Sequence, residues 1–191
     1  MLSVLVIDES RSRAGEICAG LALAGYQVAA ILASSERLSA EVEKLQPDVI
    51  LIDTDSPSRD TLENLAAMHR NMPRPIVIFT QDDGQAMIRD AVKAGVSAYI
   101  VDGLDPRRIK PIIEVARARF EDRQALRREI DEVSRKLSDR KLLDKAKGVL
   151  MKARGIDEDA AYHAMRKLAM ERGQTMAKVA RDVIDMARIL L

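Results

Sequence analysis

The chain has 191 residues, of which 47% are hydrophobic and 32% are charged, and its formal net charge is +1. Such a composition can build hydrophobic cores and still keep a chain in solution. The N-terminus lacks a basic stretch before its apolar run, which excludes a secretory signal peptide, and no stretch approaches the roughly 20 apolar residues of a membrane span. The only cysteine, Cys18, lies in an apolar run and is expected in the core. Because one thiol cannot form an intrachain disulfide, we expect a cytoplasmic protein.

Charge is divided unevenly between the two halves of the chain. Residues 1–110 carry 12 basic and 16 acidic residues, a net of −4, whereas residues 111–191 carry 19 basic and 14 acidic residues, a net of +5. A split of this kind predicts separate tasks for the two halves. Aromatic residues make up only 3% of the chain, which disfavours a sheet surface that stacks the bases of single-stranded nucleic acid.

The first 111 residues alternate between two kinds of segment. Short apolar runs rich in β-branched residues predict strands, and the longer stretches between them have the spacing of amphipathic helices. Apolar strands that alternate with helices are typical of a parallel sheet covered on both faces, so the predicted fold is a doubly wound, flavodoxin-like (βα)5 domain. We expect strands at residues 2–8, 27–32, 49–53, 76–80 and 98–101, and helices at residues 11–24, 36–45, 59–71 and 85–94.

One very long helix is predicted after Pro111, from Ile112 to about Ala153, because this stretch contains no further proline. We expect residues 112–138 to form a coiled-coil linker that joins two copies of the chain into a homodimer, at least in the active state. Packing of the seam against the chain's own domains is the alternative. The seam consists of four apolar residues at intervals of 4, 3 and 4: Leu126, Ile130, Val133 and Leu137.

Two further helices complete a predicted all-α, three-helix domain at residues 139–191. Gly155 is expected to end the long helix, and Asp157 is expected to cap the next one, which runs to about Arg172. Gly173 then ends that helix, and Thr175 is a candidate cap for the last one. So small a domain has room for only a small core, which again favours dimerisation.

Acidic side chains gather at the predicted carboxyl ends of the strands in the first domain. Asp8 and Glu9 end the first strand, and Asp53 ends the third. Chemistry in open α/β sheets gathers at this edge, and clustered carboxylates are the hard oxygen ligands that Mg²⁺ prefers. Asp53 is also a candidate nucleophile toward a phosphoryl donor, and Thr80 is placed to donate its hydroxyl to a phosphoryl oxygen.

These residues and their surroundings resemble the receiver domain of bacterial response regulators. The resemblance covers residues 1 to about 115 and rests on the segments VLVIDE, DVILIDTDSP, PIVIFT and AGVSAYIV. It implies a metal site at Asp8, Glu9 and Asp53, with Asp53 as the phosphoacceptor. Thr80 and Tyr99 then correspond to the switch hydroxyl and the switch aromatic residue.

The sequence departs from receiver domains at one position of this pocket. Receivers usually carry a lysine three residues after the switch aromatic, where it neutralises the phosphoryl group, and this chain has Asp102 there. Like charges about 4 Å apart, at an effective dielectric constant of about 20, cost on the order of 4 kcal/mol before screening. We therefore expect phosphorylation to be poor or absent and a sensor or inhibitor protein to control the receiver. The alternative is that Asp102 points to solvent and Asp53 titrates as usual.

A stripe of lysines is predicted on the C-terminal part of the long helix. At 100° per residue, Lys141, Lys145, Gly148 and Lys152 share one narrow face, whereas apolar residues take the other side, and Lys147 flanks the stripe. A glycine costs a helix about 1 kcal/mol relative to Ala, so Gly148 indicates the close approach of another backbone. Either a phosphodiester chain or a neighbouring helix would fit.

The helix that follows carries an aromatic residue beside a cation. Tyr162 either stacks on an unpaired base, with Arg166 nearby at i+4, or closes the small core. The two histidines, His69 and His163, are isolated on predicted helices and are expected at the surface. Because the sequence contains neither a catalytic arrangement nor metal-ligand spacing around them, an enzyme is not predicted.

The segment from about residue 130 to 191 resembles the ANTAR family of antiterminators. The shared features are the AKGVLM run, the AYHAMRKLAM helix and a short last helix with KVARDVI. The resemblance implies binding to paired RNA stem-loops in leader transcripts and prevention of transcription termination. Together with a receiver that lacks the lysine, it points to the antiterminators of nitrate assimilation, which a sensor protein sequesters until nitrate or nitrite is present. The RNA contacts it implies are Lys141, Lys145, Lys147, Lys152, Tyr162 and Arg166.

Two other functions compete with RNA binding. A phosphorylation-controlled, DNA-binding response regulator needs a recognition helix, but the last helix has few polar base-readers and ends apolar. A scaffold for protein interactions needs no nucleic acid, and the net charge of +5 on the C-terminal half disfavours it.

Overall fold

The structure, a computed structural model of the chain, describes residues 1–9, 13–101 and 105–190. The chain forms two compact units, Met1–Gln124 and Ala125–Leu191. Within the described ranges, no helix combines the length and the apolar character needed to cross a membrane.

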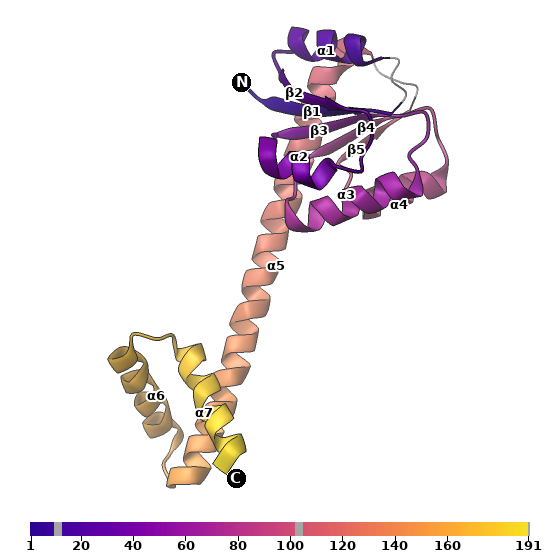
Figure 1. Ribbon diagram of the computed structural model, residues 1–191. Coiled ribbons are helices and arrows are strands. Elements are labelled where there is room, and N and C mark those ends of the chain that lie inside the picture. The colour runs from indigo at the N-terminus through magenta and orange to yellow at the C-terminus, as the bar shows by residue number, and fades with distance from the viewer. Residues whose placement is uncertain (10–12, 102–104, 191) are drawn as a thin grey trace. The chain divides into compact units, whose positions relative to one another are not determined.

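The first unit is built on a five-stranded parallel sheet (Figure 1). The strands are β1 (Ser3–Asp8), β2 (Gln27–Leu32), β3 (Val49–Asp53), β4 (Ile76–Phe79) and β5 (Ala98–Ile100), and their order is β2-β1-β3-β4-β5. Every residue of β3 and β4 is buried. A parallel strand that is covered on both faces must be apolar along its whole length, which explains the continuous apolar runs of these two segments.

Helices cover both faces of this sheet (Figure 1). On one face lie α1 (Ala14–Leu23) and the first turns of α5 (Pro106–Arg154), which contribute the buried side chains of Ile17, Leu21 and Ile113 to one core cluster. On the other face lie α2 (Leu38–Leu45), α3 (Arg59–Asn71) and α4 (Gln85–Lys93), which contribute Val42 and Leu65, among others, to a second core cluster. The predicted doubly wound fold is confirmed.

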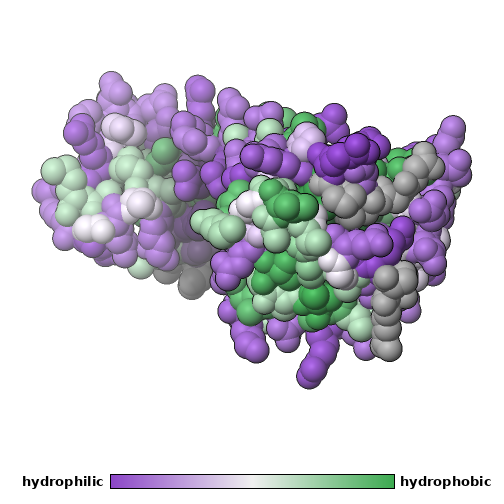
Figure 2. Space-filling view, turned by 90° about the horizontal axis from the view of Figure 1, so that it is seen from above, coloured by the Kyte–Doolittle hydropathy of each residue, from purple (hydrophilic) through white to green (hydrophobic). Residues whose placement is uncertain are grey.

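The outward face of α1 carries exposed apolar residues. Ala19, Ala22 and Leu23 are exposed there, and Glu16 is the only charged residue of the helix. Figure 2 is seen from above, on the side of α1, and shows hydrophobic residues gathered among hydrophilic ones. Cys18 also lies on α1, where it is half-buried and not part of the core that the sequence predicts for it.

The helix α5 (Pro106–Arg154) runs through both units as 49 consecutive helical residues. It begins at Pro106, before the predicted start at Ile112, so Pro111 lies inside the helix. Proline removes one backbone hydrogen bond, but Ile109 and Ile113, one on each side of it, are fully buried against the sheet. Their burial holds this part of the chain in place as a helix. Gly155 ends α5 as predicted, with a positive φ of 64°.

The second unit combines the end of α5 with α6 (Glu158–Arg172) and α7 (Met176–Leu190). The predicted cap of α6 is present, since the carboxylate of Asp157 accepts a hydrogen bond of 2.7 Å from the backbone N–H of Ala160. Gly173, with a φ of 59°, ends α6. The small core shared by the three helices contains Ala146, Ala161, Met165, Ala169, Val179, Ala180 and Ile184.

The two histidines differ in their surroundings. His163 is exposed on α6, as predicted. The expectation of a surface position is wrong for His69, which is half-buried in the first unit. Its ring stands edge-on to Phe120, with centroids 6.1 Å apart, and it packs closely against the backbone at Gly95.

Candidate receiver pocket and nucleic-acid interface

Two buried carboxylates lie side by side at the carboxyl edge of the sheet. Asp8 ends β1, Asp53 ends β3, and the two residues are paired in the parallel ladder between these strands. Asp53 is fully buried, and Asp8 is 2% exposed. Burial raises the pKa of the Asp53 carboxyl; the guanidinium of Arg13 opposes this effect, and the charges of Asp8 and Asp55 add to it.

Arg13 binds Asp53 directly. The guanidinium Nε donates a hydrogen bond of 2.9 Å to Oδ2 of Asp53, and Nη2 lies 4.0 Å from Oδ1 of Asp55. The other carboxylate oxygen of Asp53, Oδ1, is buried and has no hydrogen-bond partner among the described residues. Arg13 was not singled out from the sequence, because it fell within the predicted helix at residues 11–24, whereas the structure places it just before α1.

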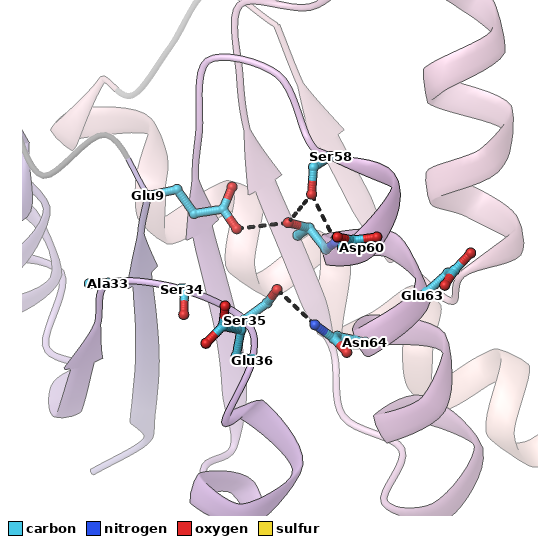
Figure 3. Close-up of a pocket in the computed structure, with 10 residues that line it drawn as sticks. Glu9, Ala33, Ser34, Ser35, Glu36, Ser58, Asp60, Glu63 and Asn64 are labelled. Carbon is cyan, nitrogen blue, oxygen red and sulfur yellow. Dashed lines mark hydrogen bonds between the residues drawn. The ribbon is translucent and has the colours of Figure 1, made fainter.

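Glu9 faces a different part of the pocket, as Figure 3 shows. Its Oε1 accepts a hydrogen bond of 2.8 Å from the hydroxyl of Thr61 in the first turn of α3. There Glu9 lines a polar cavity of about 520 Å³ together with Ser35, Asp60 and Asn64. The predicted acidic trio is therefore divided, with Asp8 and Asp53 together and the Glu9 carboxylate hydrogen-bonded to α3.

Two of the three predicted Mg²⁺ ligands have the placement that a cation needs. Asp8 and Asp53 are adjacent carboxylates, and Oδ1 of Asp53 is a buried oxygen to which the described residues donate no hydrogen bond. Such oxygens are the donors that Mg²⁺ takes, with water completing its coordination. The described residues contain no group of three or more His, Cys, Asp or Glu side chains arranged to hold a metal ion, since Glu9 stands apart. Asp8 and Asp53 thus fit Mg²⁺, and the part assigned to Glu9 stays a prediction.

The predicted switch residues are both held by backbone carbonyl groups. The hydroxyl of Thr80, which is fully buried, donates a hydrogen bond of 2.8 Å to the carbonyl oxygen of Asp55. The phenol of Tyr99 donates one of 2.9 Å to the carbonyl oxygen of Asp82. Both side chains therefore anchor loops at the same edge of the sheet as Asp53. Asp102, the residue at the usual lysine position, lies outside the described residues.

The lysine stripe of the second unit is open to solvent. Lys141, Lys145 and Lys152 are all exposed, and none of them forms an ion pair with the described residues. The opposite side of α5 is held in the core by Ala146, which is fully buried. The amphipathic pattern therefore places the three cations on the outer surface of α5, where an anionic partner can reach them.

Gly148 lies within this stripe and has open space beside it. A Cβ built on Gly148 meets no heavy atom within 4 Å, apart from the local backbone of its own helix. No neighbouring part of the described chain therefore requires a glycine at this position. The sequence allowed either a phosphodiester chain or a neighbouring helix to approach Gly148 closely. In both cases the approaching backbone must now belong to another molecule, either a polyanion or a second copy of the chain.

Lys147 does not belong to the open stripe. Its Nζ lies 2.8 Å from Oδ1 of Asp144 and 2.6 Å from Oε1 of Glu158, and its side chain is only 17% exposed. The hydrogen bond to Asp144, followed by the one to Glu158, raises the pKa of the Lys147 ammonium. In the structure Lys147 thus ties α5 to the first turn of α6. Helical spacing alone cannot reveal the contact with Glu158, which comes from another helix.

The outer face of α6 presents the aromatic residue and the cation that the sequence singled out. Tyr162 is 41% exposed and is absent from the small core, so its ring is accessible. It stands edge-on to His163, with ring centroids 6.0 Å apart. Arg166, one turn further along α6, is exposed and has no ion-pair partner among the described residues. These features favour an exposed ring over the core role that the sequence also allowed for Tyr162.

Two family models match the chain, each over one of these regions. The response regulator receiver domain matches residues 4–114, and the ANTAR domain matches residues 131–184. The receiver domain of a CheY-like protein from Methanospirillum hungatei has the same fold, with a TM-score of 0.56 and 21% sequence identity over 64% of this chain and 98% of that one.

Two curated relatives are similar to the chain, and the first matches more of it than the receiver domain alone. The transcriptional regulatory protein PdtaR of Mycobacterium tuberculosis is 30% identical over 161 residues, which is 84% of this chain and 78% of PdtaR. The nitrate regulatory protein of Klebsiella oxytoca is 34% identical over 83 residues, which is 44% of this chain and 21% of that protein. The chain therefore belongs to the response regulators in which a receiver domain is followed by an ANTAR domain, a family of regulators and not of enzymes.

Proposed function

We propose that this response regulator is an RNA-binding transcription antiterminator. The observation that carries the proposal is the stripe of Lys141, Lys145 and Lys152, three exposed cations that no described carboxylate neutralises. The stripe extends over about 16 Å of a single helix, at 1.5 Å per residue. Cations held in a row on a rigid helix suit the phosphates of a folded nucleic acid, and phosphate contacts of this kind supply most of the non-specific affinity.

The outer face of α6 supplies what is needed to recognise bases. Tyr162 presents an accessible ring and Arg166 an unpaired guanidinium. In RNA the bases of hairpin loops are unstacked and available, and an aromatic side chain that stacks on one contributes roughly 1–3 kcal/mol. We propose that the lysine stripe positions a stem-loop and that α6 contacts its loop bases.

The test measures RNA affinity as a function of salt with the full chain. We expect Lys145→Ala and Lys152→Ala to weaken binding to hairpin RNA, and each lost phosphate contact should lower the salt slope by roughly 0.7–0.9. Lys178→Ala is the matched control, because Lys178 is on α7 and is already paired with Asp182 at 2.9 Å. Unchanged affinity and slope for both stripe variants would place the RNA site elsewhere. Preference for duplex DNA over the hairpin would favour a DNA-binding regulator instead.

We also propose that two chains associate through the seam of α5. Its side chains have no cover in the described chain, with Leu126 58%, Ile130 56%, Val133 59% and Leu137 54% exposed. Burying these aliphatic groups contributes on the order of 1 kcal/mol per side chain. Association itself costs roughly 4–15 kcal/mol in lost freedom. With four residues from each chain, the gain and the cost are of similar size, so the dimer should be weak and should depend on concentration.

Control of the receiver is proposed to come from a sensor protein more than from phosphorylation. The support is Asp102, which places a carboxylate where receivers usually have a phosphate-neutralising lysine. Receivers typically bind Mg²⁺, and Asp8 and Asp53 would hold it here, where it would partly neutralise charge at the acceptor. Incubation with acetyl phosphate and Mg²⁺ should leave Asp53 unmodified in intact-mass spectra. A stable aspartyl-phosphate would contradict this proposal.

The target genes are proposed to be those of nitrate and nitrite assimilation. The support is the resemblance of the chain to antiterminators of that process and its likeness to the nitrate regulatory protein of Klebsiella oxytoca over the matched region. In vitro transcription through a terminator-bearing leader tests the proposal. Read-through should rise with the protein present for a leader from a nitrate-assimilation operon. Read-through only on leaders of other operons would contradict this assignment while leaving antitermination intact.

A further inference from the structure

The ion pair between Arg13 and Asp53 differs from the other ion pairs of the described chain. Asp53 contributes a fully buried carboxylate, whereas every other carboxylate in these pairs is at least 32% exposed. Exposed pairs contribute little, because water screens both charges. A buried carboxylate, in contrast, depends on its partner, since the loss of that partner leaves an uncompensated charge in the interior.

The position of the guanidinium bears on any cation that enters the pocket. The Nε of Arg13 lies 2.9 Å from Oδ2 of Asp53, and its Nη2 lies 4.0 Å from Oδ1 of Asp55. Only Oδ1 of Asp53 remains without a described partner. A divalent cation that binds Asp53 through Oδ1 must therefore come close to a positive charge that is already fixed on the same carboxylate. The repulsion disfavours simultaneous occupancy.

We propose that Arg13 is a positioning residue that acts as a tethered counter-ion of Asp53 and competes with Mg²⁺ for this carboxylate. Arg13 neutralises the buried charge from within the chain, so that the pocket keeps its structure without a metal ion. Mg²⁺ would bind Asp8 and Asp53 only after the guanidinium of Arg13 has moved away from Oδ2 of Asp53. This competition is confined to the receiver pocket and does not depend on RNA binding by the second unit.

The test is Mg²⁺ binding by the full chain, followed by isothermal titration calorimetry. Arg13→Met keeps much of the side-chain length and removes the charge. A charge within about 4–6 Å changes the pKa of a carboxyl by roughly 1–3, which is tenfold to a thousandfold in its affinity for a proton, so we expect Mg²⁺ to bind Arg13→Met at least about tenfold more tightly than wild type. Arg13→Lys retains the positive charge and should stay close to wild type.

The matched control is Arg59→Met. Arg59 also pairs with a carboxylate through its Nε, at 2.7 Å from Oε1 of Glu63, but both partners are exposed and neither borders Asp53. Its replacement should leave Mg²⁺ affinity unchanged. Equal Mg²⁺ affinity of wild type and Arg13→Met would overturn the proposal, as would failure of both proteins to bind Mg²⁺.

A measurement on the wild-type protein covers the case in which Arg13→Met does not fold. The hydrogen bond to Asp53 should give the Arg13 Nε–H a slowly exchanging ¹H–¹⁵N resonance, which is identified by its loss in Arg13→Lys. Mg²⁺ should shift this resonance and speed its exchange with water, in proportion to the occupancy of the metal site. A resonance that stays unchanged at Mg²⁺ saturation would show that the two cations do not compete.

Discussion

The replacement of Gly148 by alanine separates the needs of folding from those of RNA binding. Gly148 lies in the middle of a helix, where glycine is less favourable than alanine by about 1 kcal/mol. The added Cβ would meet no heavy atom within 4 Å, so it brings no steric cost within the described chain. We therefore expect Gly148→Ala to raise the free energy of unfolding of the second unit by roughly 0.5–1 kcal/mol.

The same substitution should weaken RNA binding. If a phosphodiester backbone approaches the stripe closely at Gly148, a methyl group there separates it from the flanking lysines, Lys145 and Lys152. We expect a loss of at least about tenfold in affinity, which corresponds to roughly 1.4 kcal/mol. The more stable variant would thus bind RNA more weakly. This combination is not expected if Gly148 has only a structural role.

The assay combines differential scanning calorimetry of the full chain with RNA mobility shifts. A gain of 1 kcal/mol should raise the melting temperature of a domain of this size by roughly 4–8 °C. Ala153→Gly is the inverse control, because Ala153 is exposed on α5 but lies away from the stripe. It should lower stability, by less than about 1 kcal/mol because Ala153 lies in the last turn of α5, and it should leave RNA affinity unchanged.

Two results would refute this reasoning. A stabilised Gly148→Ala protein with wild-type RNA affinity would show that no RNA backbone comes close at this residue. If the variant also dissociated more readily into monomers, the close approach would belong to a second copy of the chain. A loss of stability in dilute, monomeric protein would mean that the space beside Gly148 is not open.

Three further predictions concern packing, assembly and ionisation. Gly95→Ala should destabilise the first unit by roughly 2 kcal/mol or more in chemical denaturation, because its Cβ would lie 2.6 Å from ring atoms of His69 and the backbone φ is +99°. Ile130→Asp should convert dimers into monomers in sedimentation equilibrium, because it places a charge in the middle of the apolar seam. Tyr26 should ionise near pH 12 in an absorbance titration, because burial, followed by its hydrogen bond to Glu114, raises its pKa from 10.0 to about 12. Its contribution to stability should be complete below pH 10 and lost as the pH rises from 10 to 12.

Each of these has a clear contrary outcome. Gly95→Ala with wild-type stability would mean that the His69 ring moves aside at little cost. An unchanged molecular mass of Ile130→Asp at micromolar concentrations would remove the seam from the dimer proposal. If Tyr26→Phe leaves the number of tyrosines that titrate above pH 11 unchanged, the hydrogen bond to Glu114 does not hold the proton on Tyr26.

The fold was predictable from sequence because its determinants are local and repetitive. The continuous apolar run at Val49–Asp53 can be buried on both faces only in the middle of a parallel sheet, and β3 occupies that place. Caps were equally readable, as Asp157 and Gly173 show. The start of α5 was missed because proline is weighed as a helix breaker, whereas burial of Ile109 and Ile113 on both sides of Pro111 decides the conformation.

The details of the candidate sites depend on contacts that no local pattern encodes. Arg13 reaches Asp53 across 40 positions of sequence, and Glu9 meets Thr61 across 52. Helical spacing places Lys147 beside the lysine stripe, yet its ammonium group forms an ion pair with Glu158 of the same chain. Residue types and strand ends thus identify the pocket, but the partner of each charged group follows only from the tertiary structure.

The buried contact of Arg13 also determines how experiments on the acceptor position must be interpreted. Mutating Asp53 to Ala or Asn, the usual way to remove a phosphorylation site, also deprives the guanidinium of its nearest anion. Arg13 would then keep only the exposed Asp55, 4.0 Å away, as an ion-pair partner among the described residues. A phenotype of such a variant would therefore not report on signalling chemistry alone. Pairing each Asp53 variant with Arg13→Met in a double-mutant cycle separates the two effects.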